Sequence, residues 1–194
     1  MKITVLNLKP VVSVILLICQ LLSACGVTTP TPATTEAVAD SATDTKKWDW
    51  FNIELTDVQT GETFTMNDFS GKVVLVETMA IWCPNCIVQG NEVRKLHTLL
   101  GNPEDLISVS LDVDMNEDEA SLKEYAQEFG FEWHFAVAPL EVARALGNLY
   151  SAQYLNPPLS PMLVIDRDGS VYQFEYGKKS VEILQKNIQP FLTP

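Results

Sequence analysis

The sequence has few basic residues. Its 194 residues include 13 Lys and Arg against 25 Asp and Glu, so the formal net charge is −12 at pH 7. Proteins that bind nucleic acid or anionic lipid headgroups need clustered Lys or Arg. Neither is therefore expected as a partner. Hydrophobic residues make up 46% of the chain, which is enough for one globular domain with short extensions.

The chain also lacks an apolar run long enough to cross a bilayer. Its most apolar stretch, residues 11–22, is interrupted by polar side chains and falls short of the ~20 apolar residues that a spanning helix needs. This stretch follows a weakly basic start with Lys2 and Lys9. The small residues Ser23 and Ala24 come directly after it. That order is typical of a secretory signal peptide, and a spanning anchor is the weaker interpretation.

Leu22-Ser23-Ala24-Cys25 resembles the lipobox of bacterial lipoproteins, in which the cysteine is lipidated and becomes residue one after cleavage. The resemblance implies a signal peptide over residues 1–24 and a lipid on Cys25. The exported chain would then be anchored to the bacterial cell membrane or outer membrane, with its domain extracytoplasmic. The alternative is an ordinary signal peptide that leaves a spare cysteine.

Residues 25–45 are rich in Thr, Ala and Pro and contain almost no large apolar side chain. Such a segment cannot bury enough surface to offset the entropy of ordering it. We therefore expect a disordered tether that holds a domain, residues 46–194, off the membrane.

Cysteine is scarce, with four residues in the whole chain. Cys19 would leave with the signal peptide and Cys25 would carry the lipid, so the domain keeps Cys83 and Cys86 alone. An exported protein lies where disulfides can persist. The pair can therefore bond only with itself or with thiols of a partner.

Alternating patterns after residue 46 predict an α/β domain. A continuous β-branched run over 72–80 is typical of a strand buried on both faces. Further strands are predicted over 106–114, 133–138, 161–166 and 171–176, and helices from Pro84 to Gly101 and over 117–130, 139–150 and 180–192. Hairpin turns are predicted at Gly61 and Gly169. This order implies helices packed on a mainly parallel sheet whose last hairpin is antiparallel.

The segment Trp82-Cys83-Pro84-Asn85-Cys86 allows three interpretations: a structural disulfide, half of a zinc site or a redox centre. A disulfide here would close a very short loop and would add little stability. Zinc needs two further ligands, and the two histidines, His97 and His134, lie far apart in sequence. We therefore expect a redox centre, with no metal and no cofactor beyond the Cys83–Cys86 disulfide.

The position of the pair assigns a role to each cysteine. If a helix starts at Pro84, Cys83 lies at its N-terminus, where unpaired N–H groups and the helix dipole stabilise a thiolate. The thiolate is the nucleophilic form. Pro84 suits the first helical position because its missing N–H would have no partner there. Cys83 is predicted to attack a disulfide, and Cys86, in the first turn, to resolve the product.

The segments DFSGKVVLVETMAIWCPNC (68–86) and PMLVIDRDG (161–169) resemble those of the thioredoxin superfamily. More narrowly, they resemble exported, membrane-anchored thiol-disulfide oxidoreductases of the TlpA/ResA type, which are grouped with the redoxin and alkyl hydroperoxide reductase/thiol-specific antioxidant families. The resemblance implies a thioredoxin-like α/β fold with a central mixed sheet flanked by helices, extended here by an N-terminal β-hairpin. It also implies a monomer that reduces protein disulfides in cytochrome or oxidase assembly and is recharged by an upstream membrane electron donor.

The same resemblance implies roles for residues around the pair. Pro161 matches the cis-proline that faces the cysteines in this family, although it could simply shape a loop. Trp82 is expected beside the site, in a docking surface or in the core, next to Pro84 and Asn85.

Glu77 stands where thioredoxins carry a buried aspartate that relays protons, whereas TlpA-like members often have a neutral residue there. A carboxyl group in an apolar strand should have a raised pKa, which would make Glu77 a general base for Cys86. The alternative is a partly solvated residue without a role.

Two rival functions use the same cysteines. Peroxiredoxins typically show Pro-x-x-x-Thr-x-x-Cys, and here Val76 and Ala80 occupy the Pro and Thr positions, which disfavours a thiol peroxidase. A copper chaperone for respiratory oxidase assembly stays an alternative because soft thiolates favour Cu(I) and Met162 is a further soft residue. Sco-type copper proteins, however, have a longer cysteine spacing and a dedicated histidine, and neither is evident in this chain.

Overall fold

The computed structural model describes residues 49–192, which lie within one compact unit, Ala42–Pro194. The predicted signal peptide over residues 1–24, the lipidation site Cys25 and the tether over 25–45 lie outside the described residues. Between residues 49 and 192, no helix combines the length and the apolar character that crossing a bilayer requires.

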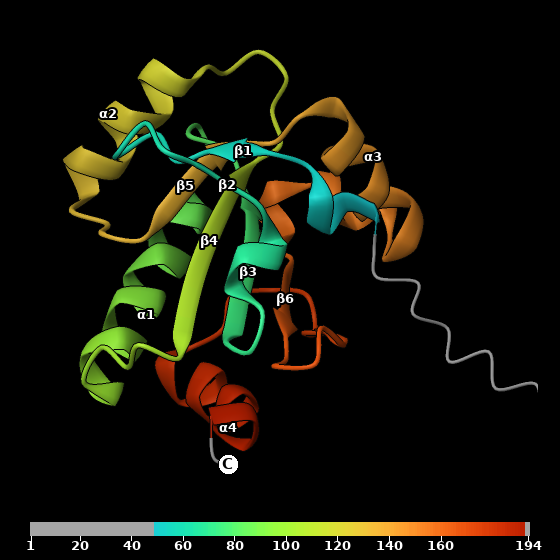
Figure 1. Ribbon diagram of the computed structural model, residues 1–194. Helices are drawn as coiled ribbons and strands as arrows, with labels where there is room; N and C mark the ends of the chain where they lie inside the picture. Colours follow the sequence, from blue (N-terminus) through green and yellow to red (C-terminus); the bar gives the residue numbers. More distant parts are fainter. Residues whose placement is uncertain (1–48, 193–194) are drawn as a thin grey trace, which may run out of the picture. The chain divides into compact units, whose positions relative to one another are not determined.

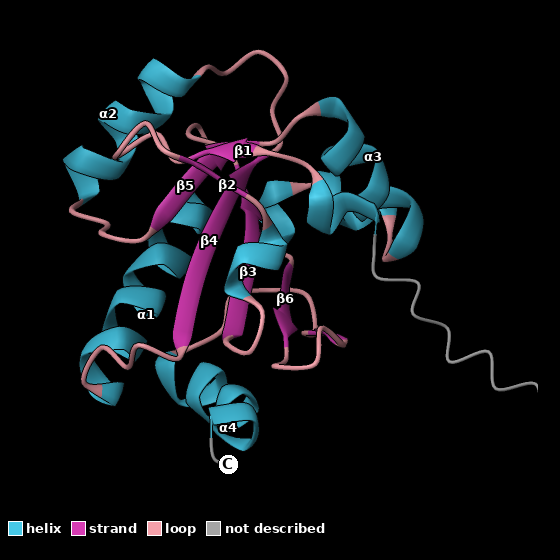
Figure 2. Cartoon of the chain, in the orientation of Figure 1, coloured by secondary structure: helices cyan, strands magenta, loops and turns pink. Residues whose placement is uncertain are grey.

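A five-stranded mixed sheet forms the centre of the described part (Figure 2). Its strand order is β5-β4-β3-β6-β7. The strands span Val73–Met79 (β3), Leu106–Asp112 (β4), His134–Val137 (β5), Met162–Ile165 (β6) and Val171–Gln173 (β7). β3 and β4 are parallel, as are β4 and β5, whereas β6 is antiparallel to both β3 and β7. All residues of β3 are buried, which confirms the central strand predicted from its continuous apolar run.

Four α-helices flank this sheet: α1 (Pro84–Leu100), α2 (Glu119–Phe129), α3 (Leu140–Leu149) and α4 (Val181–Leu192). Side chains of α1 and α4 pack with Val73 and Leu75 of β3, whereas α3 packs with Val74 and Val76. Successive strand residues point to opposite faces, so α1 and α4 cover one face and α3 the other (Figure 1). Glu77, two residues beyond Leu75, therefore faces the side that α1 covers.

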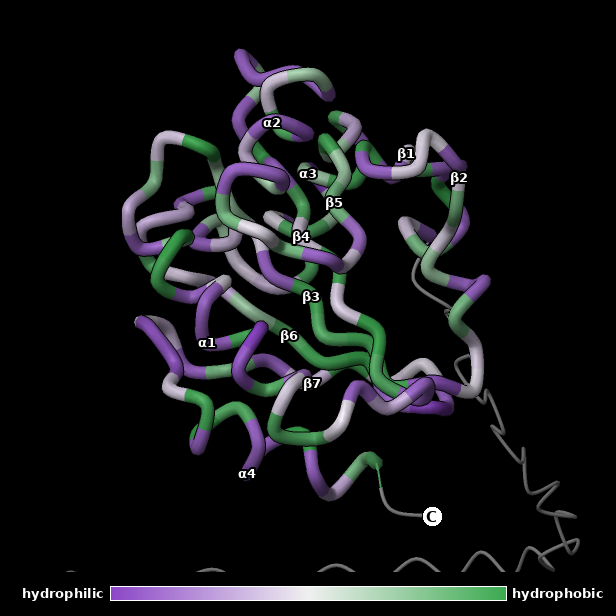
Figure 3. Tube along the Cα trace, turned by 90° about the vertical axis from the view of Figure 1, so that its left-hand side faces the viewer, coloured by the Kyte–Doolittle hydropathy of each residue, from purple (hydrophilic) through white to green (hydrophobic). Residues whose placement is uncertain are grey.

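The buried hydrophobic residues likewise form separate clusters on the two faces of the sheet. Figure 3 shows apolar stretches along β3 and β6, with hydrophilic and hydrophobic residues mixed along the surrounding helices and loops. Gly101 ends α1 in the left-handed conformation (φ 72°), which glycine adopts without steric cost. The helix thus begins and ends where the sequence predicts.

The N-terminal hairpin also forms at the predicted turn. β1 (Leu55–Thr56) pairs in antiparallel fashion with β2 (Thr63–Phe64), and Gly61 between them has a φ of 77°. The two strands form a small sheet of their own. Val58 ties this sheet to the central one, because its N–H donates to the carbonyl oxygen of Phe135 in β5 at 2.9 Å.

The connections hold short 3-10 turns that the sequence patterns did not predict: η1 (Asp49–Asn52), η2 (Met66–Phe69), η3 (Ala152–Leu155) and η4 (Pro157–Leu159). Turns of three or four residues are too short to show a helical period. η4 is the one that bears on the site, because it lies against the first turn of α1.

Candidate active site

Cys83 occupies the N-cap of α1, after the turn that follows β3. Its backbone is extended (φ −89°, ψ 109°), and Pro84 is the first helical residue. The backbone N–H of Cys86 donates a hydrogen bond of 3.3 Å to Sγ of Cys83. An N–H aimed at a sulfur from a helix N-terminus stabilises negative charge on that sulfur. The fold therefore places Cys83 at the N-terminus of a helix and Cys86 in its first turn, which is the arrangement that the predicted roles of the two cysteines require.

Both sulfurs lie below the surface. Cys83 has an exposed fraction of 0% and Cys86 of 4%, and both are free thiols. They belong to an apolar cluster that includes Met79 and Tyr125. Sγ of Cys86 donates to the carbonyl oxygen of Pro157 over 3.7 Å. A partner disulfide can reach Cys83 only after the segment around it opens, a requirement that the sequence pattern did not indicate.

Two hydrogen bonds hold the turn that leads into Cys83. The N–H of Ile81 donates to Oε2 of Glu117 at 2.8 Å, and Nε1 of Trp82 donates to Oδ2 of Asp114 at 2.6 Å. Trp82 is 55% exposed, so its ring lies at the surface beside the site and not in the core. Both acceptors belong to the loop between β4 and α2, which therefore restrains the turn.

We expect Asp114→Ala to speed alkylation of Cys83 by iodoacetamide about tenfold, because the lost charged hydrogen bond opposes opening of the turn. Mass spectrometry of the alkylated peptide at fixed pH gives the rate. Glu128→Ala, which removes an exposed carboxylate from α2, should alkylate at the wild-type rate. Equal rates for the two variants would mean that Asp114 does not restrain access to Cys83.

Glu77 is buried in β3, on the face toward α1. Its exposed fraction is 7%, and its Oε1 accepts a 2.5 Å hydrogen bond from Oγ of Ser110. Burial raises the pKa of Glu77 from 4.5 to about 7, against the lowering effects of Ser110 and Lys179. Glu77 is therefore buried, as its apolar neighbours in sequence predict, and it is not the partly solvated residue of the alternative interpretation. Its role as a base stays a prediction.

The Cys86 thiol lies close enough to Glu77 to be affected by its charge. Burial first, then hydrogen bonding with Cys83 and the charge of Glu77, raise the pKa of the Cys86 thiol. Cys86 is therefore protonated at neutral pH and needs a base before it can attack. A buried carboxyl group with a pKa near 7 can accept and return a proton in that pH range.

Ser110 and Trp133 support Glu77 and were not predicted. Ser110 of β4 lies directly opposite Glu77 of β3 in the sheet register. Nε1 of Trp133 donates to Oγ of Ser110 at 2.8 Å, which leaves the hydroxyl hydrogen of Ser110 for Glu77. The sequence feature that could have indicated Ser110 is the presence of two polar residues, Ser108 and Ser110, at alternating positions of an otherwise apolar strand.

Lys179, another residue that the sequence did not single out, brings a positive charge into the same interior. It belongs to the loop between β7 and α4 and is 3% exposed. Burial lowers its pKa from 10.5 to about 8, and the Glu77 carboxylate opposes this decrease. Lysines in short polar loops are usually solvated, so no pattern pointed to this one.

Pro161 is buried beside the site, but the peptide bond before it is trans. The N–H of Thr78, next to Glu77, donates to the carbonyl oxygen of Pro161 at 3.2 Å. Residues 49–192 contain no cis peptide bond, so the cis geometry expected for Pro161 is wrong for this structure. The turn into β6 is made instead by Ser160, whose left-handed backbone (φ 47°, ψ 56°) redirects the chain.

Asn85 joins the first turn of α1 to the same loop. Its Nδ2 donates to the carbonyl oxygen of Pro158 at 2.8 Å. Together with the Cys86–Pro157 contact, this bond fixes the first turn of α1 against η4. Pro84 is exposed at the start of the helix, where it borders the surface that a partner would meet.

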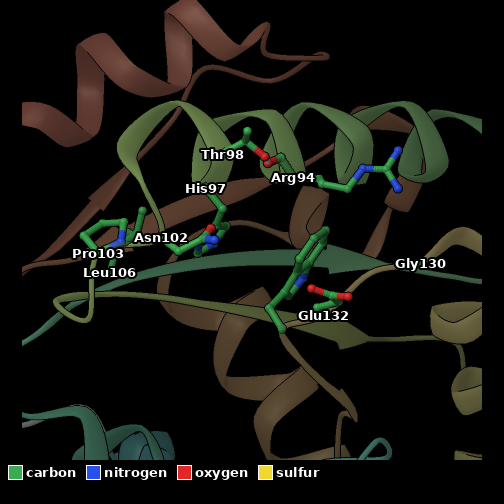
Figure 4. Close-up of a pocket in the computed structure, with 9 residues that line it drawn as sticks. Arg94, His97, Thr98, Asn102, Pro103, Leu106, Gly130 and Glu132 are labelled. Atoms are coloured by element: carbon green, nitrogen blue, oxygen red, sulfur yellow. Dashed lines mark hydrogen bonds between the residues drawn. The ribbon is translucent and has the colours of Figure 1, made fainter.

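A cavity of about 440 Å³ lies away from the cysteines, between the second half of α1 and the loop before β5 (Figure 4). His97 and Glu132 are among its lining residues, as is Trp133. Nε2 of His97 forms a 2.8 Å hydrogen bond with Oγ of Ser108. The cavity contains none of the predicted site residues, and Trp133 connects it to Ser110.

In the described part of the chain, no three Cys, His, Asp or Glu residues gather as a possible ligand set. The two thiols are the residues that a soft metal ion would contact.

The fold and the cysteine pair define the class: a thioredoxin-like thiol-disulfide oxidoreductase. A family model described as Redoxin matches residues 33–188. The chain belongs to the redoxin family. None of the curated proteins compared with it matches.

Several solved structures share the fold of this chain. A thiol:disulfide interchange protein of the thioredoxin family from Chlorobium tepidum is 19% identical, with a TM-score of 0.59 over 73% of this chain and 93% of that one. A secreted disulfide oxidoreductase from Mycobacterium tuberculosis is 14% identical, with a TM-score of 0.55 over 72% and 96%. A thiol-disulfide isomerase from Corynebacterium glutamicum is 21% identical, with a TM-score of 0.54 over 70% and 90%. At these identities the likeness concerns the fold.

Proposed function

We propose that the protein is an extracytoplasmic reductant of protein disulfides that acts through Cys83 and Cys86. The observation that carries the proposal is the position of Cys83 at the N-cap of α1, with the Cys86 N–H on its sulfur. The Glu77 carboxyl group is buried within electrostatic reach of Cys86. The site thus offers a nucleophile, a resolving thiol and a base.

The reaction proceeds in two displacements. The Cys83 thiolate attacks one sulfur of a partner disulfide, and the other partner sulfur leaves as a thiolate that takes a proton from solvent. Cys86 then gives its proton to Glu77 and attacks the sulfur of Cys83. The mixed disulfide breaks, and the second partner sulfur leaves as a thiolate that takes a proton from Glu77 or solvent. The partner thus leaves with two thiols, and the Cys83/Cys86 dithiol has given up two electrons and become a disulfide.

The surroundings of Cys86 favour the reducing direction. Burial and the charge of Glu77 both disfavour a thiolate on Cys86. Ionisation of Cys86 therefore adds little to the stability of the reduced, dithiol form. A dithiol that is not stabilised in this way gives up its electrons more readily. The reduction potential is therefore expected nearer to about −270 mV, as in reducing members of the fold, than to about −120 mV, as in strongly oxidising ones.

The proposed setting is the outer face of a bacterial membrane. Lipid on Cys25 would hold the chain there, and the tether over 25–45 would give the domain reach. The partners would be cysteines of apocytochromes or of respiratory oxidase subunits, and an upstream membrane dithiol would restore the reduced pair. These assignments rest on the lipobox and on the resemblance stated above.

One comparison tests the function against its two rivals. The reduced wild-type chain is given a disulfide-bonded protein, hydrogen peroxide or Cu(I) in parallel, and initial rates and Cu(I) affinity are measured. We expect protein disulfide to be reduced at least about a hundredfold faster than peroxide, because nothing in the site is dedicated to peroxide. Faster peroxide consumption, or tight Cu(I) binding without disulfide reduction, would replace the proposal by a peroxidase or a copper chaperone.

A further inference from the structure

The buried ammonium group of Lys179 is unusual for a loop residue. Lysine is almost never fully buried unless its charge is compensated. Here Nζ donates a hydrogen bond to the carbonyl oxygen of Ser160. Ser160 directly precedes Pro161, and the register of β3 and β6 places Met162 opposite Glu77. The ammonium group is therefore held two residues before Met162, the β6 residue that pairs with Glu77.

The main chain of Lys179 is fixed as firmly as its side chain. Its N–H donates to Oε1 of Gln89 at 2.7 Å, and its carbonyl oxygen accepts from Nε2 of the same side chain at 3.2 Å. Gln89 lies in α1, the helix that carries Cys86, and is 1% exposed. One glutamine thus binds the Lys179 backbone to the helix of the cysteines.

Lys179 and Glu77 act on each other across this interior. Lys179 lowers the pKa of Glu77, and Glu77 raises that of Lys179. Within residues 49–192, no ion pair of 4.0 Å or less joins the two groups, so the influence is that of two buried charges and not of a direct contact. Charges separated by protein interact more strongly than charges in water.

Other titratable groups face the same space. Cys83 and Cys86 come from the start of α1, and Tyr125 comes from α2. Burial, followed by the charges of Glu77 and the cysteines, raises the pKa of Tyr125, so it is neutral at physiological pH. Lys179 is therefore the positive group among those that act on Glu77.

We propose that Lys179 is a positioning residue of the exchange reaction, whose buried charge keeps Glu77 ionised and able to take the proton of Cys86. This inference rests on the proposed function. In the resolving step, the proton moves from Sγ of Cys86 to the Glu77 carboxylate while Lys179 keeps its charge. The ammonium group thus stabilises the base before the transfer and touches neither sulfur.

The two charges define a pH window. Glu77 becomes ionised as the pH rises through about 7, and Lys179 loses its charge as the pH rises through about 8. Both groups are charged together most fully between these values. Removing the lysine charge should raise the pKa of Glu77, because burial raises this pKa and the lysine charge no longer lowers it.

The test compares Lys179→Met with Lys178→Met in the full-length chain. Lys178 is the exposed neighbour of Lys179 in the same loop, so its substitution removes the same formal charge from the surface. Disulfide reduction is measured from about pH 6 to pH 9, and Glu77 is titrated by carboxyl ¹³C NMR. For Lys179→Met we expect both midpoints to rise by about one pH unit, with about a tenfold loss of rate at pH 6 and less than a twofold loss at pH 9. Lys178→Met should match the wild type.

A purely structural role for Lys179 predicts a different result: a uniform loss of rate at every pH, with the Glu77 titration unmoved. That outcome overturns the proposal while disulfide reduction by the wild type still stands. If Lys179→Met does not fold, Glu77→Gln gives the reciprocal measurement. By linkage, the pKa of Lys179 should fall below about 8 in that variant, and an unchanged Lys179 titration would equally overturn the proposal.

Discussion

Cys83→Ser is expected to abolish disulfide reduction, and Cys86→Ser to trap the partner as a mixed disulfide. A serine hydroxyl is not ionised near pH 7 and cannot form the mixed disulfide, so the rate should fall on the order of a thousandfold or more. Without Cys86, the adduct on Cys83 has no neighbouring thiol to displace the partner. Non-reducing electrophoresis with peptide mapping should find the adduct in Cys86→Ser alone.

The outcome that would contradict this assignment is equally specific. If the adduct formed on Cys86 in Cys83→Ser and not on Cys83 in Cys86→Ser, the roles of the two cysteines would be reversed. The Cys83→Ser/Cys86→Ser double variant is the control, because it should form no adduct in this part of the chain.

Glu77→Gln is expected to slow disulfide reduction about a hundredfold near pH 8, because the amide cannot take the proton of Cys86. In the wild type the rate should rise with pH and reach half of its maximum near pH 7, the pKa of Glu77. In the variant this rise should be absent. Glu54→Gln, at an exposed position before β1, should keep the wild-type profile. A wild-type rate in Glu77→Gln with the same midpoint would remove Glu77 from the mechanism.

The same substitution changes how stability depends on pH. The pKa of Glu77 is raised by folding, so the folded state binds more protons than the unfolded state between pH 4.5 and about 7. The stabilisation is complete below pH 4.5 and is lost as the pH rises through about 7, a decrease of about 3 kcal/mol in the free energy of unfolding. Glu77→Gln should lack this decrease, and urea titrations at several pH values measure it.

The elements and the cysteine geometry could be predicted because local patterns specify them. The continuous run over 72–80 can be satisfied only by a buried central strand, and Pro84 and Gly101 mark the two ends of α1. Glu77 could be singled out because it is a carboxyl group within an apolar run and stands where thioredoxins carry a buried aspartate. The strand and the helix need only neighbours in sequence for their prediction, whereas Glu77 also needed the resemblance.

The support around Glu77 could not be predicted in the same way, because it comes from distant segments. Ser110 of β4 donates to Glu77, Trp133 from the loop before β5 donates to Ser110, and Lys179 from the loop before α4 acts on Glu77 through its charge. Only the tertiary fold brings them together. The trans bond before Pro161 escaped prediction because the conformation of Ser160, and not the residue type of Pro161, makes the turn.

The full burial of Cys83 is the feature that most changes the view taken from sequence. The motif indicates a reactive cysteine at a helix start, but not that Ile81 and Trp82, in the turn before it, donate hydrogen bonds to carboxylates of another loop. Reactivity and access are therefore controlled separately in this protein. The rate of exchange should depend on opening of the turn as well as on the chemistry of the sulfurs.

The most direct test of the redox centre is a titration in dithiol/disulfide buffers of defined potential, followed by tryptic mapping. Lys72 and Arg94 bracket a peptide that contains both Cys83 and Cys86 and no other basic residue. The account predicts that this peptide reversibly loses two hydrogens in one two-electron transition, with a midpoint nearer to about −270 mV than to about −120 mV. A peptide that keeps both thiols free at every potential would contradict the account.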